Sequence, residues 1–450
     1  MAAAAPSLGG TAPELMRPLL TGASVAGLVA ALTLGSAVAF GRPSGERAAA
    51  APAGAPAPGI PGLQKRLREQ PRDAAGWASL GIAYVEQARV TADPAYYPKA
   101  EEVLHRSLRE GPGNDGALAG LGALAAARHD FHGALRYADR ALKANPYAQR
   151  AAAVRVDALV ELGRYDDALA AARRADAVRP GVPVFTRLAY VRELRGEVAE
   201  ARRVLGLARA SATDRGDLAY IAVQLGELAW NDGDLGRAGR EYAEALRLSP
   251  GHLPALDGEA RVRAARGDTA GTLAVRAGIV ERLPLPQYVT EYGELLESAG
   301  RRDEAERQYA VATAWARIAR ANGVDADLET ALSESDHGDA GDALRAAWAE
   351  YRRRCPGARV RQCSVHAADA LAWALHVNGR DGEALRYARQ ATATGYRRAS
   401  FRFHLGVIEK ALGERAARRD LAGSLRRNPD FSPLWAPRAK AALDDLGGAS

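Results

Sequence analysis

The sequence predicts an all-α protein: a solenoid of about ten helix–turn–helix units, closed by a C-terminal helix. Three observations predict this fold. A small residue recurs along the chain at intervals of 33 to 41 residues. A second small residue usually follows seven positions later, two turns further along the same helix. Alanine is abundant while aromatic residues make up only 6%, which suits closely packed helical layers better than one large compact core.

Composition excludes several other classes of protein. The 450 residues are 48% hydrophobic and 26% charged, which excludes a disordered or collagen-like chain. Two cysteines exclude a disulfide-rich scaffold and a four-cysteine zinc site. The formal net charge is +7, but the basic residues, mostly arginine, are interspersed with acids. We therefore expect no nucleic-acid partner.

The N-terminal region predicts a membrane anchor. Residues 19–40 carry no charge and lie between Arg17 and Arg42. As a helix they would span about 33 Å, comparable to the hydrocarbon core of a bilayer. The Ala-Val-Ala that ends at Ala39 resembles a signal-peptidase site, so cleavage there and secretion is the alternative. Residues 1–18 form the N-terminal flank.

Residues 41–62 are rich in Ala, Pro and Gly and lack large apolar side chains, so they predict a tether to a folded region that begins near Leu63. We expect the solenoid to lie on the extracytoplasmic side. Arginines flank both ends of the hydrophobic segment, however, so the positive-inside bias is weak and a solenoid facing the cytosol stays open.

The repeats occupy residues 63–432. In several units a Leu-Gly pair or its equivalent, such as Leu121-Gly122 or Tyr292-Gly293, lies about thirteen residues before the recurring small residue, and prolines such as Pro146 close many units. The repeat period, the Leu-Gly pair and the closing proline together indicate a helix–turn–helix solenoid. The recurring small residues are Ala100, Ala134, Ala168, Ala201, Ala238, Thr272, Ala305, Ala343, Ala384 and Ala417.

The pattern resembles the tetratricopeptide repeat (TPR) family, whose units read W-x₂-L-G-x₂-Y, then A-x₃-F, then P. The first unit carries Trp77, Leu80, Gly81 and Tyr84 at this spacing. The resemblance implies a right-handed solenoid with the first helix of each unit on the concave side. It also implies that the protein is an interaction scaffold.

Two units depart from the pattern, and a final helix ends the array. We expect an extra loop at Val90–Pro98 in the first unit, while the eighth unit, about residues 324–357, lacks the Leu-Gly pair. Residues 434–446 read as an amphipathic helix that covers the last apolar face. Residues 433–450 therefore form a capping helix and tail.

No motif predicts catalysis, a cofactor or a metal site. Gly120–Ala125 formally matches the dinucleotide fingerprint G-x-G-x-x-A but lies in the middle of a predicted helix without a preceding strand. His129 and His132 are interpreted as turn residues. His366 and His376 lie ten residues apart on one helix, so we expect them to be solvated or to line the groove. The chain is therefore predicted not to be an enzyme and to have no small-molecule substrate.

The repeat phase predicts a concave groove that is acidic and aromatic. Such a groove would suit a basic peptide, held by carboxylates and by cation–π contacts. The alternative is that these acids are ordinary solvated side chains of amphipathic helices. The candidate groove residues are Asp157, Tyr190, Glu193, Tyr220, Glu227, Trp230, Asp257, Arg261, Glu294 and Glu297.

The groove lacks the carboxylate clamp of chaperone-tail adaptors in the same family. These adaptors hold a terminal carboxylate with Lys and Asn. The matching positions here carry Ala78, Ile82, Ala119 and Ala123.

The two cysteines, Cys355 and Cys363, bracket the loop CPGARVRQC between units eight and nine. The spacing fits no common metal motif. In an exported protein it predicts a local disulfide, whereas in a cytosolic protein the two residues would be free thiols.

Three functions remain open from the sequence. The first is a non-enzymatic scaffold, tethered outside a membrane through residues 19–40, that binds protein or peptide partners. The second is the same solenoid as a membrane-anchored adaptor facing the cytosol. The third is an envelope accessory that contacts an anionic polymer through its arginines.

Overall fold

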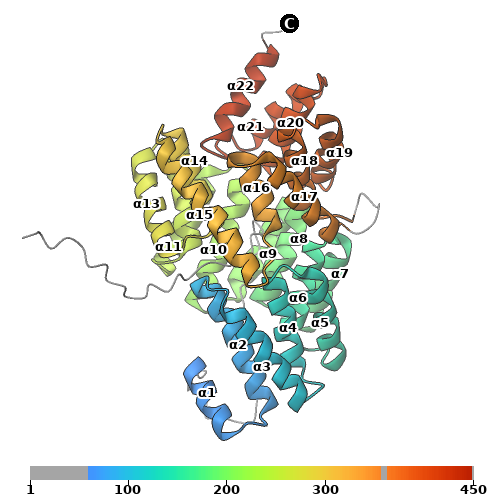
Figure 1. The fold of residues 1–450 in the computed structure, drawn as a ribbon. Helices are drawn as coiled ribbons and strands as arrows, with labels where there is room; N and C mark the ends of the chain where they lie inside the picture. The colour runs from blue at the N-terminus through green and yellow to red at the C-terminus, as the bar shows by residue number, and fades with distance from the viewer. Residues whose placement is uncertain (1–58, 356–361, 448–450) are drawn as a thin grey trace, which may run out of the picture.

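The computed structural model describes residues 59–355 and 362–447, and within them it contains 22 helices and no strand (Figure 1). The predicted all-α solenoid of ten helix–turn–helix units is confirmed in this region. None of the described helices has the length and apolarity needed to cross a membrane. The predicted hydrophobic segment, 19–40, lies outside the described residues.

A short helix, α1 (Ile60–Glu69), precedes the ten pairs, and α22 (Trp435–Gly447) follows them. The first helices of the pairs are α2 (Ala74–Thr91), α4 (Asp115–Ala127), α6 (Gln149–Glu161), α8 (Val182–Leu194), α10 (Arg215–Asn231), α12 (Leu253–Ala265), α14 (Pro286–Ser298), α16 (Asp327–His337), α18 (Val365–Val377) and α20 (Ala399–Ala411). The second helices are α3 (Tyr96–Glu110), α5 (Phe131–Ala144), α7 (Tyr165–Val178), α9 (Val198–Ser211), α11 (Leu235–Leu248), α13 (Thr269–Arg282), α15 (Arg302–Ala321), α17 (Ala340–Arg354), α19 (Asp381–Thr392) and α21 (Ala417–Arg427).

Small residues allow the two helices of a unit to pack closely. The recurring alanines of the second helices, Ala100 and Ala134 among them, are completely buried. A Cβ atom added to Gly81 would lie 2.4 Å from Cγ of Leu104, and one added to Gly226 would lie 2.5 Å from Cε1 of Tyr242. The Leu-Gly signature therefore marks places where only glycine admits a large side chain from the partner helix.

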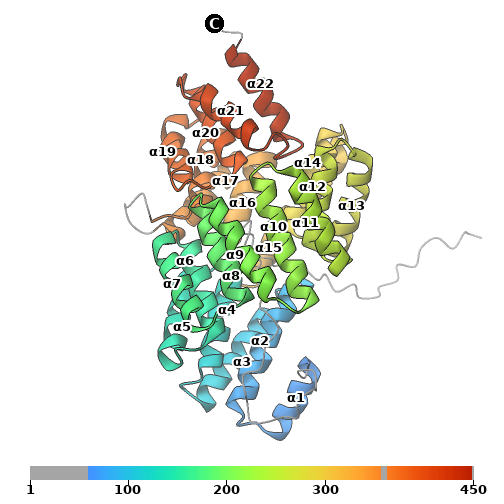
Figure 2. The ribbon, with the colours of Figure 1, turned by 180° about the vertical axis from the view of Figure 1, so that it is seen from behind.

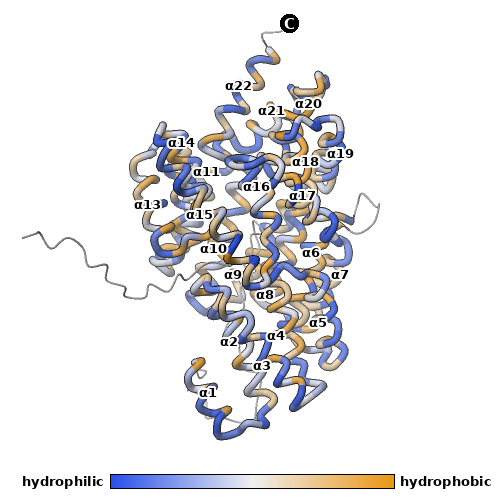
Figure 3. The backbone as a smooth tube through the Cα atoms, in the orientation of Figure 1, coloured by the Kyte–Doolittle hydropathy of each residue, from blue (hydrophilic) through white to orange (hydrophobic). Residues whose placement is uncertain are grey.

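Many second helices begin at an aspartate that caps them. Asp130, Asp234 and Asp268 each accept a hydrogen bond from a backbone N–H three residues later, at 2.8–2.9 Å. Such caps satisfy N–H groups that the first turn leaves without helical partners. Figure 3 shows that hydrophobic and hydrophilic residues are interspersed along the helices of the array.

Three details of the structure differ from what the sequence predicts or add to it. The loop predicted at Val90–Pro98 is present but shorter, at residues 92–95, because α2 extends to Thr91, ends where Ala92 adopts a left-handed conformation with φ of 53°, and is followed by α3 from Tyr96. The eighth unit is a complete pair, α16 and α17, despite its missing Leu-Gly. The end of the proposed tether, residues 60–62, forms the first turn of α1.

The solenoid coils so far that its later units rest on its earlier ones. In both Figure 1 and Figure 2, α17–α20 lie directly over α6–α9. The backbone N–H of Asp325 donates to the carbonyl of Arg128 at 3.1 Å, and the amide of Asn428 donates to the carbonyl of Trp230 at 2.9 Å. Ordinary repeat proteins contact only neighbouring repeats, so these contacts add a second interface along the array.

Glycines at the tight turns of the early units make this second interface close. Gly163, Gly196 and Gly233 all have positive φ. A Cβ atom on Gly163 would lie 1.9 Å from the carbonyl carbon of Cys363, and one on Gly233 would lie 2.1 Å from the carbonyl oxygen of Arg427. Helix α18 lies inside this stack, and every residue from Val365 to Leu375 is buried.

Candidate partner-binding cavity

A cavity of about 630 Å³ lies among the later units. Its walls come from α12, α14, α16, α18 and α20, with contributions from α13, α15 and α17, from Trp230 at the end of α10, and from the segment 429–440 that runs into α22. First helices therefore supply most of the lining, as expected for the concave side of such a solenoid.

Three of the residues predicted for the groove line this cavity: Trp230, Arg261 and Glu294. The other seven lie outside its lining. They are Asp157, Tyr190, Glu193, Tyr220, Glu227, Asp257 and Glu297. The structure thus gathers only the later part of the predicted groove around one cavity.

Several of the carboxylates predicted to bind a peptide form ion pairs with arginines of the chain itself. Arg261 forms ion pairs with Glu227 and, at 3.4 Å, with Asp257. Arg276, whose side chain is 4% exposed, pairs with Asp257 and with Glu291. Burial raises the pKa of Asp257 to about 6, although Arg276 opposes the shift. These acids belong to an internal charge network between α10, α12, α13 and α14.

Trp230 completes this network at the edge of the cavity. The guanidinium of Arg261 lies 5.4 Å from the centre of its ring, within the range of a cation–π contact. The hydroxyl of Tyr242 donates to Glu227 at 2.8 Å. A cation is therefore held by a carboxylate and a ring face, as predicted for a basic peptide, but this cation is Arg261 of the chain itself.

The predicted groove residues of the earlier units are buried or half-buried, and two of them contact side chains of neighbouring units. Asp157 accepts two hydrogen bonds of 2.9 Å from Arg187 of the next unit. Glu193 accepts a 2.8 Å hydrogen bond from Asn231, and burial raises the pKa of this carboxyl to about 7. Burial likewise raises the pKa of Tyr190 and, to about 12, that of Tyr220.

The remaining two predicted residues, Glu294 and Glu297, attach the capping helix to α14. Glu294 accepts hydrogen bonds from Ser432 at 2.9 Å and from the indole N–H of Trp435 at 3.3 Å. Glu297 accepts from Tyr309 at 3.1 Å and pairs with Arg438 at 3.2 Å. The cap is therefore held by polar contacts across 138 to 141 residues of chain.

Sequence reasoning missed the neighbours of Glu294 in space. Asp336 and His337, at the end of α16, bring their ligand atoms and that of Glu294 within 4.8 Å of one another. The only local sign was the adjacent Asp-His before Gly338 in the eighth unit, which lacks Leu-Gly. A contact between α14 and α16 cannot be read from spacing alone.

The histidines noted in the sequence have separate environments. His129 is buried, and its Nδ1 lies 2.6 Å from the carbonyl oxygen of Asp325. His132 contacts the carbonyl of Arg353 at 3.0 Å. His366 lines the cavity, where burial lowers its pKa to about 3, and His376 lies 2.5 Å from Asp381.

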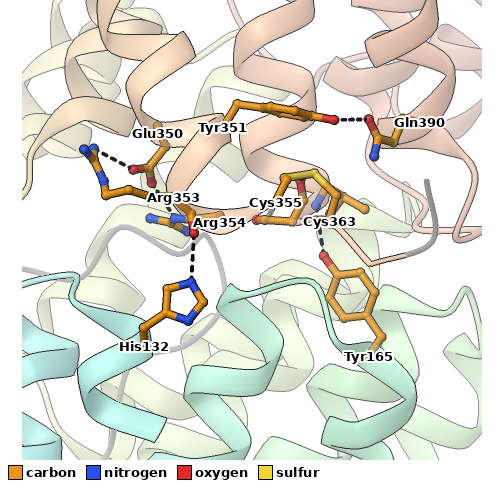
Figure 4. The surroundings of a disulfide bond; sticks show 11 residues. His132, Tyr165, Glu350, Tyr351, Arg353, Arg354, Cys355, Cys363 and Gln390 are labelled. Carbon is orange, nitrogen blue, oxygen red and sulfur yellow. Dashed lines mark hydrogen bonds and ion pairs between the residues drawn. A yellow bond between two sulfur atoms is a disulfide. The ribbon is translucent and has the colours of Figure 1, made fainter. Parts of the chain in front are cut away.

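A disulfide joins Cys355 to Cys363 at the interface between the two superhelical levels (Figure 4). Both cysteines are buried. Beside it, the hydroxyl of Tyr165 accepts a 2.9 Å hydrogen bond from the N–H of Val365. Arg354, 2% exposed, pairs with Glu161 from the lower level at 2.5 Å and with Glu350 of its own helix. The predicted Arg-bearing loop is thus anchored at both ends.

Gly120–Ala125, the formal dinucleotide fingerprint, lies within α4. A Cβ atom on Gly122 would approach Val154 of the next unit at 3.2 Å, so this glycine belongs to helix packing. No strand precedes it in the described residues.

Comparisons with known proteins agree in the type of fold. No family model matches the chain, and no curated protein matches it. Among solved structures, a thermophilic TPR protein of Thermus thermophilus is 25% identical over 43% of this chain and 98% of its own, with a TM-score of 0.38. PilF of Pseudomonas aeruginosa is 17% identical over 48% of this chain and 92% of its own, with a TM-score of 0.36.

The human IFIT1 dimer with PPP-AAAA is 14% identical over 74% of this chain and 77% of its own, with a TM-score of 0.45. Similarity at this level concerns the repeat architecture. The chain's own ten helix pairs and their period show an all-α solenoid of helix–turn–helix repeats, and the W-x₂-L-G-x₂-Y of its first unit resembles the TPR pattern.

Proposed function

We propose that this chain is a non-enzymatic interaction scaffold that holds a basic peptide segment of a protein partner in the cavity between α12 and α22. We further propose that the solenoid is exported and is tethered through residues 19–40. The observation that carries the binding proposal is the cavity itself, whose volume lies in the range of specific ligand pockets.

The charges of the lining favour a basic segment. Carboxylates outnumber arginines and lysines in the lining. The ionised carboxylates are Glu291, Glu294, Glu334, Asp336, Asp342, Asp369 and Asp430, against Arg261, Arg276, Arg317, Arg320, Arg398 and Lys440; Glu329 also lines the cavity, but burial raises its pKa to about 8 and keeps it neutral.

The acidic surplus is concentrated between α14 and α18. Within the described residues, no arginine or lysine forms an ion pair with Glu294, Asp336 or Asp369; their partners are serine, tryptophan and histidine. Trp435 and Phe403, whose ring centroids lie 6.0 Å apart, also line the cavity. A lysine or arginine of a partner could therefore meet both a carboxylate and a ring face there.

Two features support export. The disulfide between Cys355 and Cys363 is of a kind that persists in oxidising compartments. The hydrophobic segment 19–40 has the length of a membrane anchor. A reporter fused after Ser450 tests the compartment directly: activity of a periplasm- or exterior-dependent reporter is expected, and activity of a cytosol-dependent one would overturn the export proposal.

The binding proposal is tested by filling the cavity. Ser333 lines the cavity, and Ala310 is exposed on α15 outside its lining. Fluorescently labelled nine-residue peptides of basic, neutral and acidic composition are titrated with the full chain. We expect saturable binding of basic peptides that Ser333→Trp abolishes and Ala310→Trp preserves. Equal binding by both variants, or a preference for acidic peptides, would overturn the proposal.

A further inference from the structure

Three potential metal ligands converge at the wall of the cavity. Glu294 from α14 and the adjacent Asp336 and His337 from the end of α16 place one ligand atom each within 4.8 Å of the others. Nε2 of His337 lies 3.8 Å from Oε1 of Glu294. Atoms bound to one tetrahedral zinc lie about 3.4 Å apart, because zinc–ligand distances are about 2.0–2.2 Å. Small side-chain shifts would therefore bring this set into coordination.

The imidazole of His337 is an independent sign of a ligand. Its side chain is only 4% exposed, and Nε2 is buried without a hydrogen-bond partner although it faces Glu294. Tyr309 stacks on the ring with 3.7 Å between the ring centroids, which fixes the orientation of the imidazole. A buried polar atom without a partner is costly, and a metal bond would satisfy it.

Hydrogen bonds from neighbouring elements already orient the two carboxylates. Trp373 of α18 donates its indole N–H to Asp336 at 2.7 Å. Ser432 and Trp435 donate to Glu294 at 2.9 and 3.3 Å. Outer partners of this kind hold metal ligands in place and are a regular feature of metal sites in proteins.

The second nitrogen of the His337 imidazole, Nδ1, also has a carboxylate beside it. Oε2 of Glu297 lies 3.9 Å from Nδ1 of His337. A carboxylate beside the second nitrogen favours the tautomer that leaves Nε2 free to bind a metal. Glu297 thus has the position of an outer partner rather than a ligand.

We propose that Glu294, Asp336 and His337 bind one Zn²⁺ ion. One imidazole nitrogen and two carboxylate oxygens suit zinc, whereas Mg²⁺ and Ca²⁺ prefer ligand sets made of oxygen alone. Glu294 and Asp336 also line the cavity, so a fourth position of the ion faces it. The ion would join α14 to α16 and, through Ser432 and Trp435, to the start of α22.

Zinc binding to the untagged full chain, purified in mild detergent and stripped with EDTA, tests the site. Competition with a chromophoric zinc chelator gives the affinity and the stoichiometry. We expect one tightly bound Zn²⁺ per chain and much weaker competition by Mg²⁺ and Ca²⁺. We expect His337→Asn and Asp336→Asn each to weaken zinc binding by at least about 100-fold, since even loss of an outer partner costs about 10- to 100-fold.

Two further variants separate the site from surface binding and from misfolding. His105→Asn removes a histidine of α3, far from the cluster in sequence, and is expected to leave zinc affinity unchanged. Trp373→Phe keeps all three ligands but removes the donor to Asp336, and is expected to weaken binding about 10- to 100-fold. Circular dichroism at 222 nm establishes that each variant retains its helices.

The zinc site would be contradicted by the absence of stoichiometric binding, or by wild-type affinity in folded His337→Asn and Asp336→Asn. It does not depend on the proposed peptide function, because zinc binding is measured without peptide. The two are nevertheless linked: zinc neutralises Glu294 and Asp336, so saturating Zn²⁺ is expected to weaken binding of basic peptides to the wild type but not to His337→Asn.

Discussion

The hydroxyl of Tyr165 accepts a 2.9 Å hydrogen bond from the backbone N–H of Val365, although 200 residues separate the two along the chain. Other contacts between the two superhelical levels recur at nearly the same separation. The pair His129 and Asp325 are 196 residues apart, and Trp230 and Asn428 are 198 apart. Because the separation in sequence is nearly constant, each of these units stacks on the unit about six positions later in the chain. The solenoid therefore forms a closed stack.

Removing the hydroxyl of Tyr165 tests this stack at one hydrogen bond. Tyr165→Phe leaves the buried N–H of Val365 without its acceptor, so we expect the free energy of unfolding to fall by about 1–3 kcal/mol. Urea unfolding measures the change. Tyr147→Phe is the control, since Tyr147 is 73% exposed and its loss should cost less than about 0.5 kcal/mol. Equal losses would show that the hydrogen bond contributes nothing.

A buried arginine holds the two levels together by charge. Arg354→Met removes the buried cation that pairs with both Glu161 and Glu350, so we expect a loss of about 3–5 kcal/mol in unfolding free energy. Arg352→Met, an exposed position on the same helix, should change little. Thermal denaturation of both variants makes the comparison. A Tm of Arg354→Met within a degree of the control would contradict a structural role for this ion pair.

Reduction of the disulfide between Cys355 and Cys363 should lower the stability of the fold. The bridge closes a short loop with a sequence separation of 8. The chain-entropy relation gives a stabilisation of about 2.5 kcal/mol for a loop of this size. We expect Cys355→Ala/Cys363→Ala and the reduced wild type to lose about this amount in urea unfolding. Mass spectrometry of the non-reduced protein checks the bond, and two alkylatable thiols would contradict it.

The carboxyl of Glu329 should make stability depend on pH. Burial is the main cause that raises its pKa to about 8, with Glu350 adding to the shift and Arg354 opposing it, and neither oxygen has a hydrogen-bond partner. The folded state then holds a proton that the unfolded state releases above about pH 4.5. The free energy of unfolding should therefore fall as pH rises from about 5 to 8.

Glu329→Gln should flatten this slope, because glutamine keeps the shape of the neutral acid without titrating. Urea unfolding of wild type and variant at pH 6.5 and 8.5 measures the difference in slope, to which buried His129 and His366, with pKa values of about 4 and 3, contribute equally in both proteins. An unchanged slope in Glu329→Gln would assign the pH dependence to other buried acids, such as Glu193.

The local repeat was predictable from sequence, while the closed stack was not. Ala100, Gly81 and their equivalents recur because neighbouring helices in a unit cross there, and spacing records such short-range contacts. The stack depends on the small rotation between units, which accumulates over about six of them. No single residue encodes that sum, so the contact of Tyr165 with Val365 left no periodic signal.

The candidate site shows the same division. Repeat phase placed Trp230, Arg261 and Glu294 on the concave side, and the cavity contains all three. Phase could not predict that Arg276, from a second helix, reaches Asp257. It also could not bring His337 to Glu294, since that contact requires the actual angle between α14 and α16.

Paired glycine substitutions test the closed stack most directly. Gly163 and Gly300 occupy equivalent turns with φ of +68° and +77°, so alanine at either costs about 1–2 kcal/mol for the left-handed conformation. Only at Gly163 would the new Cβ meet the other level, 1.9 Å from the carbonyl carbon of Cys363, while nothing lies within 4 Å at Gly300. Urea unfolding and hydrogen exchange at the Val365 amide report the outcome. We predict that Gly163→Ala loses a further 1–3 kcal/mol, about the cost of overpacking, and exposes that amide, whereas Gly300→Ala does not; equal losses with a protected Val365 amide in both would contradict the stack.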